Sequence, residues 1–336
     1  MNGVLNSYQD RLIPIIEKEM FQYFNELMPA EFFEQKDILR DHFNWKKTGY
    51  SKKPTGKRLR PFILLLVAEG FGGDFEVAIP GAVAIEFIHN FSLIHDDIED
   101  HDEYRHGRPA VWRKWGIEKA INAGDALFSL AFLSLSRSWD KNIHYQDIYT
   151  ILGRTCAKLT GGQSMDLSFE REAEVTTKDY LLMISGKTAS LFSACAEIGA
   201  FLGGGRVEDS KRFAKFGQTL GMAFQLHDDW LGLWGQPELT GKKKGNDLIA
   251  GKKTFPIIYA LEQNPDLFEK IKQVKVTKNS DDLIQEIALT GAKEFTIEYE
   301  NKLVASALND LILLQDSNRP IQALKELTQT ISNRDY

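Results

Sequence analysis

Residues 82–100 read AVAIEFIHNFSLIHDDIED, an apolar stretch that ends in a cluster of acids. No glycine or proline interrupts it, and its composition favours a helix. Asp96 and Asp100 lie four residues apart, so a helix brings both carboxylates to one face, with Asp97 beside them. The stretch therefore predicts an apolar helix that presents acids at its C-terminal end.

The rest of the chain is also typical of helices. No proline occurs between Pro109 and Pro237, and Ala, Leu, Glu, Lys and Gln dominate that span. Glycines punctuate the helical stretches, but no low-complexity linker or shift in composition divides them. We therefore predict an all-α protein with a single domain over residues 1–336.

The composition excludes several classes of protein. The 336 residues are 43% hydrophobic and 26% charged, as in an ordinary globular protein. The longest apolar run, Pro61 to Ala68, is far shorter than the ~20 residues that span a bilayer. Residues 1–20 do not resemble a secretory signal. We therefore expect a cytoplasmic protein without a transmembrane segment. The net charge of −6 and the lack of a basic stripe predict that it does not bind nucleic acid.

The acidic pattern returns as LHDD at residues 226–229. Carboxylates ~5.5 Å apart repel by less than about 1 kcal/mol in water but by roughly 3 kcal/mol at an effective dielectric of 20. A solvated acidic face is therefore tolerated, whereas acids in a cleft need cations. Mg²⁺ binds one or two carboxylates and leaves positions for phosphate oxygens. Two such clusters on facing helices would form a diphosphate-binding metal site, with His95 and His227 in packing roles.

Basic residues accompany the acids. The run GKRLRP at residues 56–61 supplies three cations just before an apolar helix, where free N–H groups and arginine forks attract phosphate. Other cations follow each acidic motif, at residues 105–108 and 252–253, and Lys187 interrupts an apolar stretch. A solvated turn or a snorkelling lysine explains any one of them. Their association with two acidic clusters indicates a substrate with several negative oxygens.

Taken together, these residues resemble the trans-type isoprenyl diphosphate synthases, also called the polyprenyl synthetase family. Seven motifs occur in the family's order, and their number and order make the resemblance specific although each alone is weak. They are GKRLRP (56–61), HDDIED (95–100), GDALF (124–128), GQSMDL (162–167), GKTA (186–189), FQLHDD (224–229) and DLIAGKKT (247–254).

The resemblance implies an isoprenoid synthase-type helical bundle around a deep central cavity, usually a homodimer, that joins isopentenyl diphosphate to an allylic diphosphate. It implies Mg²⁺, three ions with substrate bound, on Asp96, Asp97, Asp100, Asp228 and Asp229. It implies contacts with the allylic diphosphate from Arg105, Lys187 and Lys252, and with isopentenyl diphosphate from Lys57, Arg60 and His89. The reacting region would be lined by Gln163, Asp166, Thr188 and Gln225.

Two positions depart from the family pattern. The second acidic motif reads DDWLG, so Gly232 replaces the common third aspartate. Because the two leading acids remain, we expect metal binding to survive. His106 stands where the family often has a second arginine. It is a cation only at lower pH, so we expect weaker binding of the homoallylic diphosphate unless Arg108 compensates.

Product length depends on the helix that carries the first acidic motif. Phe91 lies five residues before Asp96, ~7.5 Å down the helix, with Ser92 beside it and Phe87 a turn deeper. If the growing hydrocarbon runs along this helix, Phe91 forms its floor; core packing is the alternative role. In similar enzymes, one aromatic residue at this position implies a mid-length product. We expect twenty carbons, with fifteen and twenty-five as alternatives.

The expected chemistry needs no protein nucleophile. Mg²⁺ and cationic side chains stabilise the departing diphosphate, the alkene attacks the allylic cation, and water must be excluded. Two other functions use the same residues: a terpene cyclase-like relative that acts on an allylic diphosphate alone, and a non-catalytic partner subunit of a heteromeric synthase. An HD-type phosphohydrolase would need a set of histidine ligands that these aspartate pairs do not supply.

Overall fold

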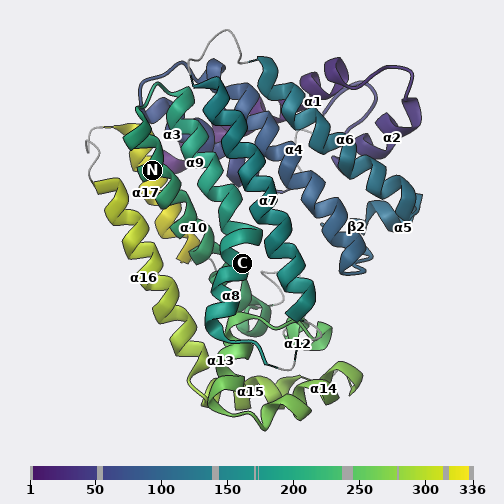
Figure 1. Ribbon diagram of the computed structural model, residues 1–336, viewed down its shortest axis with the longest axis vertical. Helices are drawn as coiled ribbons and strands as arrows, with labels where there is room; N and C mark the ends of the chain where they lie inside the picture. The colour runs from purple at the N-terminus through teal and green to yellow at the C-terminus, as the bar shows by residue number, and fades with distance from the viewer. Residues whose placement is uncertain are drawn as a thin grey trace. The chain divides into compact units, whose positions relative to one another are not determined.

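The computed structural model describes residues 3–50, 56–137, 144–169, 172, 174–236, 245–277, 280–312 and 318–332. These residues are almost entirely helical, which confirms the predicted all-α class (Figure 1). Within them, the strands form one short antiparallel pair that the sequence did not predict, β1 (Tyr104–Arg105) and β2 (Arg108–Pro109).

The helices are numbered in chain order. Their bounds are α1 (Val4–Leu27), α2 (Phe33–His42), α3 (Leu59–Gly70), α4 (Phe75–Glu99), α5 (Val111–Trp115), α6 (Ile117–Leu135), α7 (Tyr145–Phe169), α8 (Thr177–Ile184), the π-helix η2 (Ser185–Ala189), α9 (Ser190–Leu202), α10 (Val207–Trp234), α12 (Asn246–Ala250), α13 (Phe255–Gln263), α14 (Leu267–Thr277), α15 (Asp281–Leu289), α16 (Ala292–Ile312) and α17 (Arg319–Ser332).

The chain divides into two compact units. Unit 1 comprises Met1–Cys156, Ala194–Ala214 and Leu314–Leu324, and unit 2 comprises Ala157–Ser193, Lys215–Leu313 and Lys325–Tyr336. Helices α7, α9, α10 and α17 contribute residues to both. The single domain over residues 1–336 stays a prediction.

The core of unit 1 is built on α3 and α4. Every residue from Pro61 to Ala68 is buried, and so is nearly all of the apolar part of α4. Glycines allow close packing on these helices: a Cβ at Gly124 of α6 would lie 2.3 Å from the His95 ring, and one at Gly199 would lie 2.5 Å from the carbonyl oxygen of Leu64. The unit therefore holds the first acidic motif on a rigid, buried helix.

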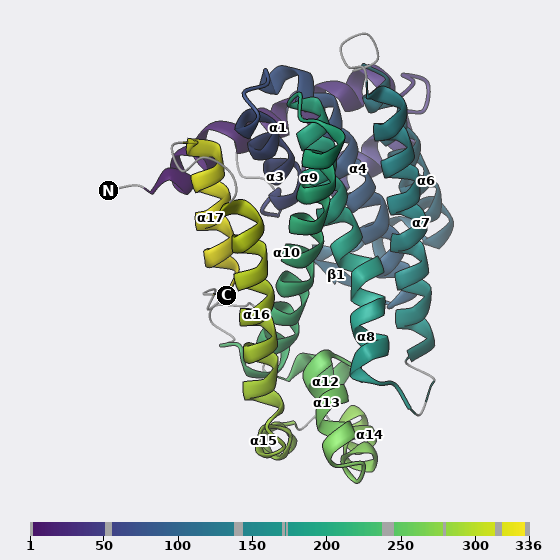
Figure 2. The ribbon, with the colours of Figure 1, turned by 60° about the vertical axis from the view of Figure 1, so that its left-hand side comes forward.

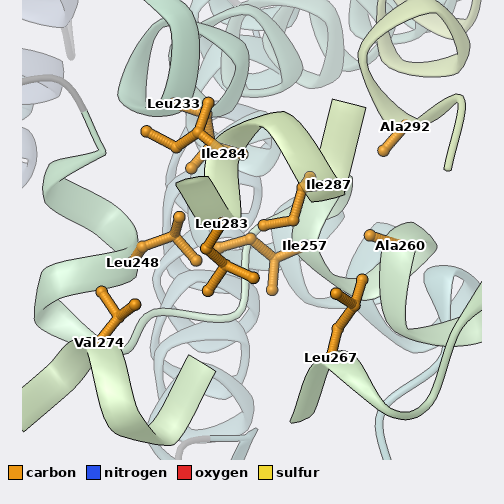
Figure 3. Close-up of a cluster of buried hydrophobic side chains, with 10 residues drawn as sticks. All are labelled: Leu233, Leu248, Ile257, Ala260, Leu267, Val274, Leu283, Ile284, Ile287 and Ala292. Atoms are coloured by element: carbon orange, nitrogen blue, oxygen red, sulfur yellow. The ribbon is translucent and has the colours of Figure 1, made fainter. Parts of the chain in front are cut away.

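Unit 2 contains a buried cluster that gathers the ends of several helices (Figure 3). Its members come from α10 and from α12 to α16: Leu233, Leu248, Ile257, Ala260, Leu267, Val274, Leu283, Ile284, Ile287 and Ala292. Figures 1 and 2 both show α12, α13, α14 and α15 side by side. This packing fixes the segment that carries Lys252 against the end of α10.

Two helical stretches are long and apolar enough to cross a membrane, Phe75–Glu99 and Thr177–Leu202. In the most apolar 18-residue windows of these stretches, 72% and 61% of the residues are buried inside the protein. We therefore interpret both stretches as core helices.

Candidate active site

The first acidic motif lies at the C-terminal end of α4, as predicted. Asp100 caps the helix, and its backbone N–H donates to the carbonyl oxygen of Asp96 over 2.8 Å. The side chains of Asp96 and Asp100 are half-buried, whereas Asp97 is only 1% exposed. The three acids of this motif are therefore not equivalent.

Asp97 is paired with a cation from the protein itself. Arg105 donates from Nε to Asp97 Oδ1 over 2.8 Å and makes a second bond to the same oxygen through Nη2. Its Nη2 also lies 3.9 Å from Asp96 Oδ2. Burial raises the pKa of Asp97 to about 6, against the opposing effect of the Arg105 guanidinium. Arg105 thus joins the buried acid to its more accessible neighbour.

The short sheet positions Arg105. Its turn residues His106 and Gly107 have φ angles of 51° and 73°, the pattern of a type I′ hairpin turn. Across the hairpin, Arg108 donates through Nη1 to the carbonyl oxygen of Asp41 over 2.7 Å and through Nη2 to its carboxylate over 3.0 Å. Arg108 is therefore bound to α2, which leaves it poorly placed to compensate for His106.

The basic run meets this hairpin and α4 within unit 1. A Cβ at Gly56 would lie 3.8 Å from His106 Nε2, and Lys57 is exposed. Arg60 Nη1 lies 3.2 Å from His89 Nε2. Because a guanidinium only donates, His89 accepts this bond as a neutral ring. Burial and the neighbouring Arg60 both lower the pKa of His89 well below its usual value.

Lys187 lies in a π-helical turn within unit 2. The turn η2 interrupts the α8 to α9 stretch at the GKTA motif, as π-bulges often do at functional sites. The π-helical turn approaches α7 closely because residue 162 of α7 is a glycine. A Cβ at Gly162 would lie 2.2 Å from the Lys187 backbone nitrogen. The Lys187 ammonium donates to Asp166 Oδ2 over 2.5 Å. Two predicted site residues are thus directly paired.

Asp229 stands at the centre of a buried chain of hydrogen bonds in unit 2. Its Oδ2 accepts from the Tyr180 hydroxyl over 2.6 Å and from the Phe255 backbone N–H over 3.2 Å. Its Oδ1 accepts from Gln225 over 3.0 Å, and Gln225 in turn accepts from the Thr188 hydroxyl over 2.7 Å. Burial raises the pKa of Asp229 to about 8. The carboxylate ties α10 to α8 and to the start of α13.

The two aspartate pairs share one arrangement. In each pair the second residue, Asp97 or Asp229, is buried and bound to donors, whereas Asp96 is half-buried and Asp228 is exposed. In the part of the chain that the structure describes, no three acids, histidines or cysteines come close enough to hold a metal ion alone. The accessible carboxylates suit Mg²⁺, which takes few protein ligands and completes its shell with water or phosphate oxygens.

The segment after α10 brings another carboxylate to the second motif. A Cβ at Gly232 would lie 1.9 Å from Asp247 Oδ2. The backbone N–H of Lys252 donates to the carbonyl oxygen of Asp247 over 2.9 Å, and the Lys253 ammonium donates to the carbonyl oxygen of Glu172. Asp247 thus occupies the space where the third aspartate of the family motif would project. The preceding residues, 237–244, lie outside the described part of the chain.

Both histidines of the repeated pattern bond to protein groups. His227 Nδ1 lies 3.1 Å from Glu300 Oε1 and is buried, and His95 Nε2 lies 3.2 Å from the carbonyl oxygen of Ile121. Each ring therefore packs the motif helix against a neighbouring helix.

Phe91 meets an aromatic residue from α6. Its ring centroid lies 5.3 Å from that of Phe128 and 4.9 Å from that of His95, and Phe91 is 8% exposed. Phe87 is fully buried, and the Ser92 hydroxyl donates to the carbonyl oxygen of His89 over 2.8 Å. The sequence placed Phe128 in the GDALF motif but not beside Phe91, because that contact follows from the packing of α6 on α4.

Comparison with known proteins gives the family. The model of the polyprenyl synthetase family matches residues 46–289. Geranylgeranyl diphosphate synthase of Methanosarcina mazei is 42% identical over 235 residues, which cover 69% of this chain and 72% of that protein. The enzyme of the same name from Saccharolobus solfataricus is 35% identical over 326 residues, covering 93% and 97%.

A solved structure extends the likeness over the whole fold. The crystal structure of geranylgeranyl pyrophosphate synthetase from Pyrococcus horikoshii Ot3 matches with a TM-score of 0.88 and 31% identity over 98% of both chains. The chain is therefore a member of the polyprenyl synthetase family, and its class of enzyme is the chain-elongating trans-prenyltransferase.

Proposed function

We propose that this protein condenses isopentenyl diphosphate with an allylic diphosphate and releases a twenty-carbon product. The observation that carries the proposal is the set of acidic and basic motif residues, complete except at Gly232 and His106, in a chain similar over most of its length to two geranylgeranyl diphosphate synthases. The reaction is that of the family. Residues in each of the two units carry separate roles in it.

The accessible carboxylates carry the metal. We assign Mg²⁺ binding to Asp96 and Asp100 in unit 1 and to Asp228 in unit 2, whose accessible carboxylates would hold the metal. When bound, Mg²⁺ neutralises the charge that develops on the leaving diphosphate. Asp97 and Asp229, which the resemblance also assigns to the metal, hold Arg105 and the start of α13 in place through their hydrogen bonds.

The cations orient the two diphosphates. Arg105, Lys187 and Lys252 donate to the allylic diphosphate and so stabilise its departure. Lys57, Arg60 and His89 hold isopentenyl diphosphate, with the neutral His89 ring kept in place by Arg60. His106 adds a weaker contact beside Lys57. Thr188 and Gln225 present polar atoms to the reacting carbons while Asp229 fixes their orientation.

Product length is set where α4 meets α6. We propose that Phe91, backed by Phe128, stops the hydrocarbon five residues below Asp96, with Ser92 and Phe87 beside and beneath it. The names of the two relatives support twenty carbons.

The proposed active form is a cytoplasmic homodimer. Helix α6 exposes apolar side chains that a second copy would cover, since Ile117, Ile121 and Leu133 are 45%, 42% and 47% exposed. Sedimentation of the purified protein measures this assembly directly.

One assay tests the function. Purified protein is incubated with Mg²⁺, labelled isopentenyl diphosphate and allylic primers of five, ten and fifteen carbons. Labelled twenty-carbon diphosphate is the expected product. Cyclic hydrocarbon formed from an allylic substrate alone would favour a cyclase instead, and inactivity that a second protein relieves would favour a partner subunit.

A further inference from the structure

Arg58 stands between two proposed substrate ligands, Lys57 and Arg60, but its own side chain turns into the core. It is 3% exposed and lies between Glu17 of α1 and Glu86 of α4. Its Nε donates to Glu17 Oε1, and its Nη1 donates to Glu86 Oε1 over 2.8 Å. The side chain of the middle cation of the basic run therefore bonds to protein carboxylates inside unit 1.

Each glutamate accepts one further hydrogen bond. Glu17 Oε2 accepts from Trp45 Nε1 over 3.2 Å, and Glu86 Oε1 accepts from Asn90 Nδ2 over 3.1 Å. Asn90 Oδ1 lies 2.9 Å from His42 Nε2. Buried charges are costly unless they are paired and hydrogen-bonded, and this network pairs both glutamates with Arg58; among the described residues, Arg58 Nη2 and Glu86 Oε2 have no hydrogen-bond partner. It connects α1, the end of α2, the start of α3 and α4.

The backbone at Arg58 explains why such a network is required. Arg58 precedes the first turn of α3 with φ 48° and ψ 34°, in the left-handed region that suits glycine and strains other residues. A strained residue of this kind persists only where its surroundings hold it. The turn leaves Lys57 exposed and places Arg60 in the first turn of α3, beside His89.

We propose that Arg58 is a positioning residue for the isopentenyl diphosphate site. Its ion pairs hold the left-handed turn, and the turn sets Lys57 relative to Arg60 and His89. The inference rests on the proposed function, which assigns those three side chains to that diphosphate. Arg58 lies over Phe43, with Cζ 5.9 Å from the ring centroid, and acts through its neighbours. Glu17, far from every motif in sequence, thereby acts on substrate binding.

Two substitutions separate this role from simple packing. Arg58→Met keeps most of the side-chain volume but removes the ion pairs, so the strained turn loses the interactions that hold it. Arg58→Gly removes the whole side chain but adopts the left-handed backbone without strain. We expect Arg58→Met to raise the KM for isopentenyl diphosphate about tenfold, the loss of one charge-assisted contact. Arg58→Gly should raise it less, roughly threefold, because the backbone tolerates the turn.

The control variant is Leu12→Ala, which removes a fully buried side chain of α1. It lowers the urea midpoint without altering the turn, so its KM values should stay those of the wild type. In all variants the KM for the allylic primer should be unchanged. Calorimetric titration with isopentenyl diphosphate alone should give the same order of affinities as the KM values, independent of turnover.

Three results would overturn the inference: an unchanged KM in Arg58→Met, an equal rise for both substrates, or weaker binding in Arg58→Gly than in Arg58→Met. If Arg58→Met does not fold, Glu17→Gln carries the test, because it keeps an acceptor and removes one ion pair. A selective rise in the same KM is then expected, and no rise counts against the inference. Wild-type protein that elongates no primer refutes the proposed function itself.

Discussion

Gly232→Asp restores the common third aspartate of the second acidic motif, and we predict that it harms this protein. The new Cβ would lie 1.9 Å from Asp247 Oδ2, whereas real Cβ atoms essentially never approach another atom within 3.0 Å. Asp247 must therefore move by at least 1.1 Å, the difference between 3.0 and 1.9 Å. The chain already places a carboxylate there from α12, so a second one is surplus.

The magnitude follows from three contributions. Gly232→Ala gains about 1 kcal/mol of helix propensity but incurs an overpacking cost of about 1–3 kcal/mol, for a net loss of up to about 2 kcal/mol. Gly232→Asp adds like-charge repulsion of about 4 kcal/mol for carboxylates ~4 Å apart at an effective dielectric of 20, which rotation of Asp247 toward solvent partly relieves. The aspartate variant should therefore lose on the order of 2–5 kcal/mol.

Urea unfolding with a chelator present measures these losses in the absence of metal. Gly232→Asp should be less stable than Gly232→Ala, and the double variant Gly232→Asp with Asp247→Ala should regain most of the loss. Added Mg²⁺ should stabilise Gly232→Asp more than the wild type, because a cation relieves the repulsion. Wild-type stability in Gly232→Asp, or no recovery in the double variant, would refute the reasoning.

Three further predictions concern the site. Asp96→Ala should lower kcat about a hundredfold or more while circular dichroism stays unchanged, and near-normal turnover would remove the metal role of Asp96. Phe91→Ala should lengthen the product, because the Phe128 ring alone covers less of the floor; chromatography of the dephosphorylated prenols measures this, and an unchanged product spectrum contradicts it. Asp229→Asn should alter the pH dependence of stability. The folded pKa of Asp229 is raised by burial from 3.8 to about 8, so the folded protein keeps a proton that the unfolded chain releases, and its stability falls as pH rises through that window. The variant should show a shallower fall in urea midpoint between pH 5 and 8 in metal-free protein, and an unchanged slope would count against the raised pKa.

Much of the fold could be predicted from the sequence, because a helix depends on residues only a few positions apart. The apolar run at Pro61 to Ala68 became the buried α3, and the acids at 96–100 came at the end of α4 as predicted. The hairpin at Tyr104 to Pro109 was not predicted, because two-residue strands show no alternation of apolar residues. The turn is of type I′, with His106 in the left-handed region. The His-Gly pair was the signal in the sequence that could have indicated it.

The sequence by itself determined the family and the chemical types of the site, since seven motifs in order and an i, i+4 spacing of acids are properties of the chain alone. Only the tertiary structure decided what each residue of a motif does. It buried Asp97 and Asp229 while leaving their partners accessible, turned Arg58 into the core between its neighbours, and brought Asp247 to Gly232. The physical reason is that burial and ion pairing depend on contacts between residues far apart in sequence, as between Glu17 and Arg58, and periodicity carries information only over a few turns of one helix.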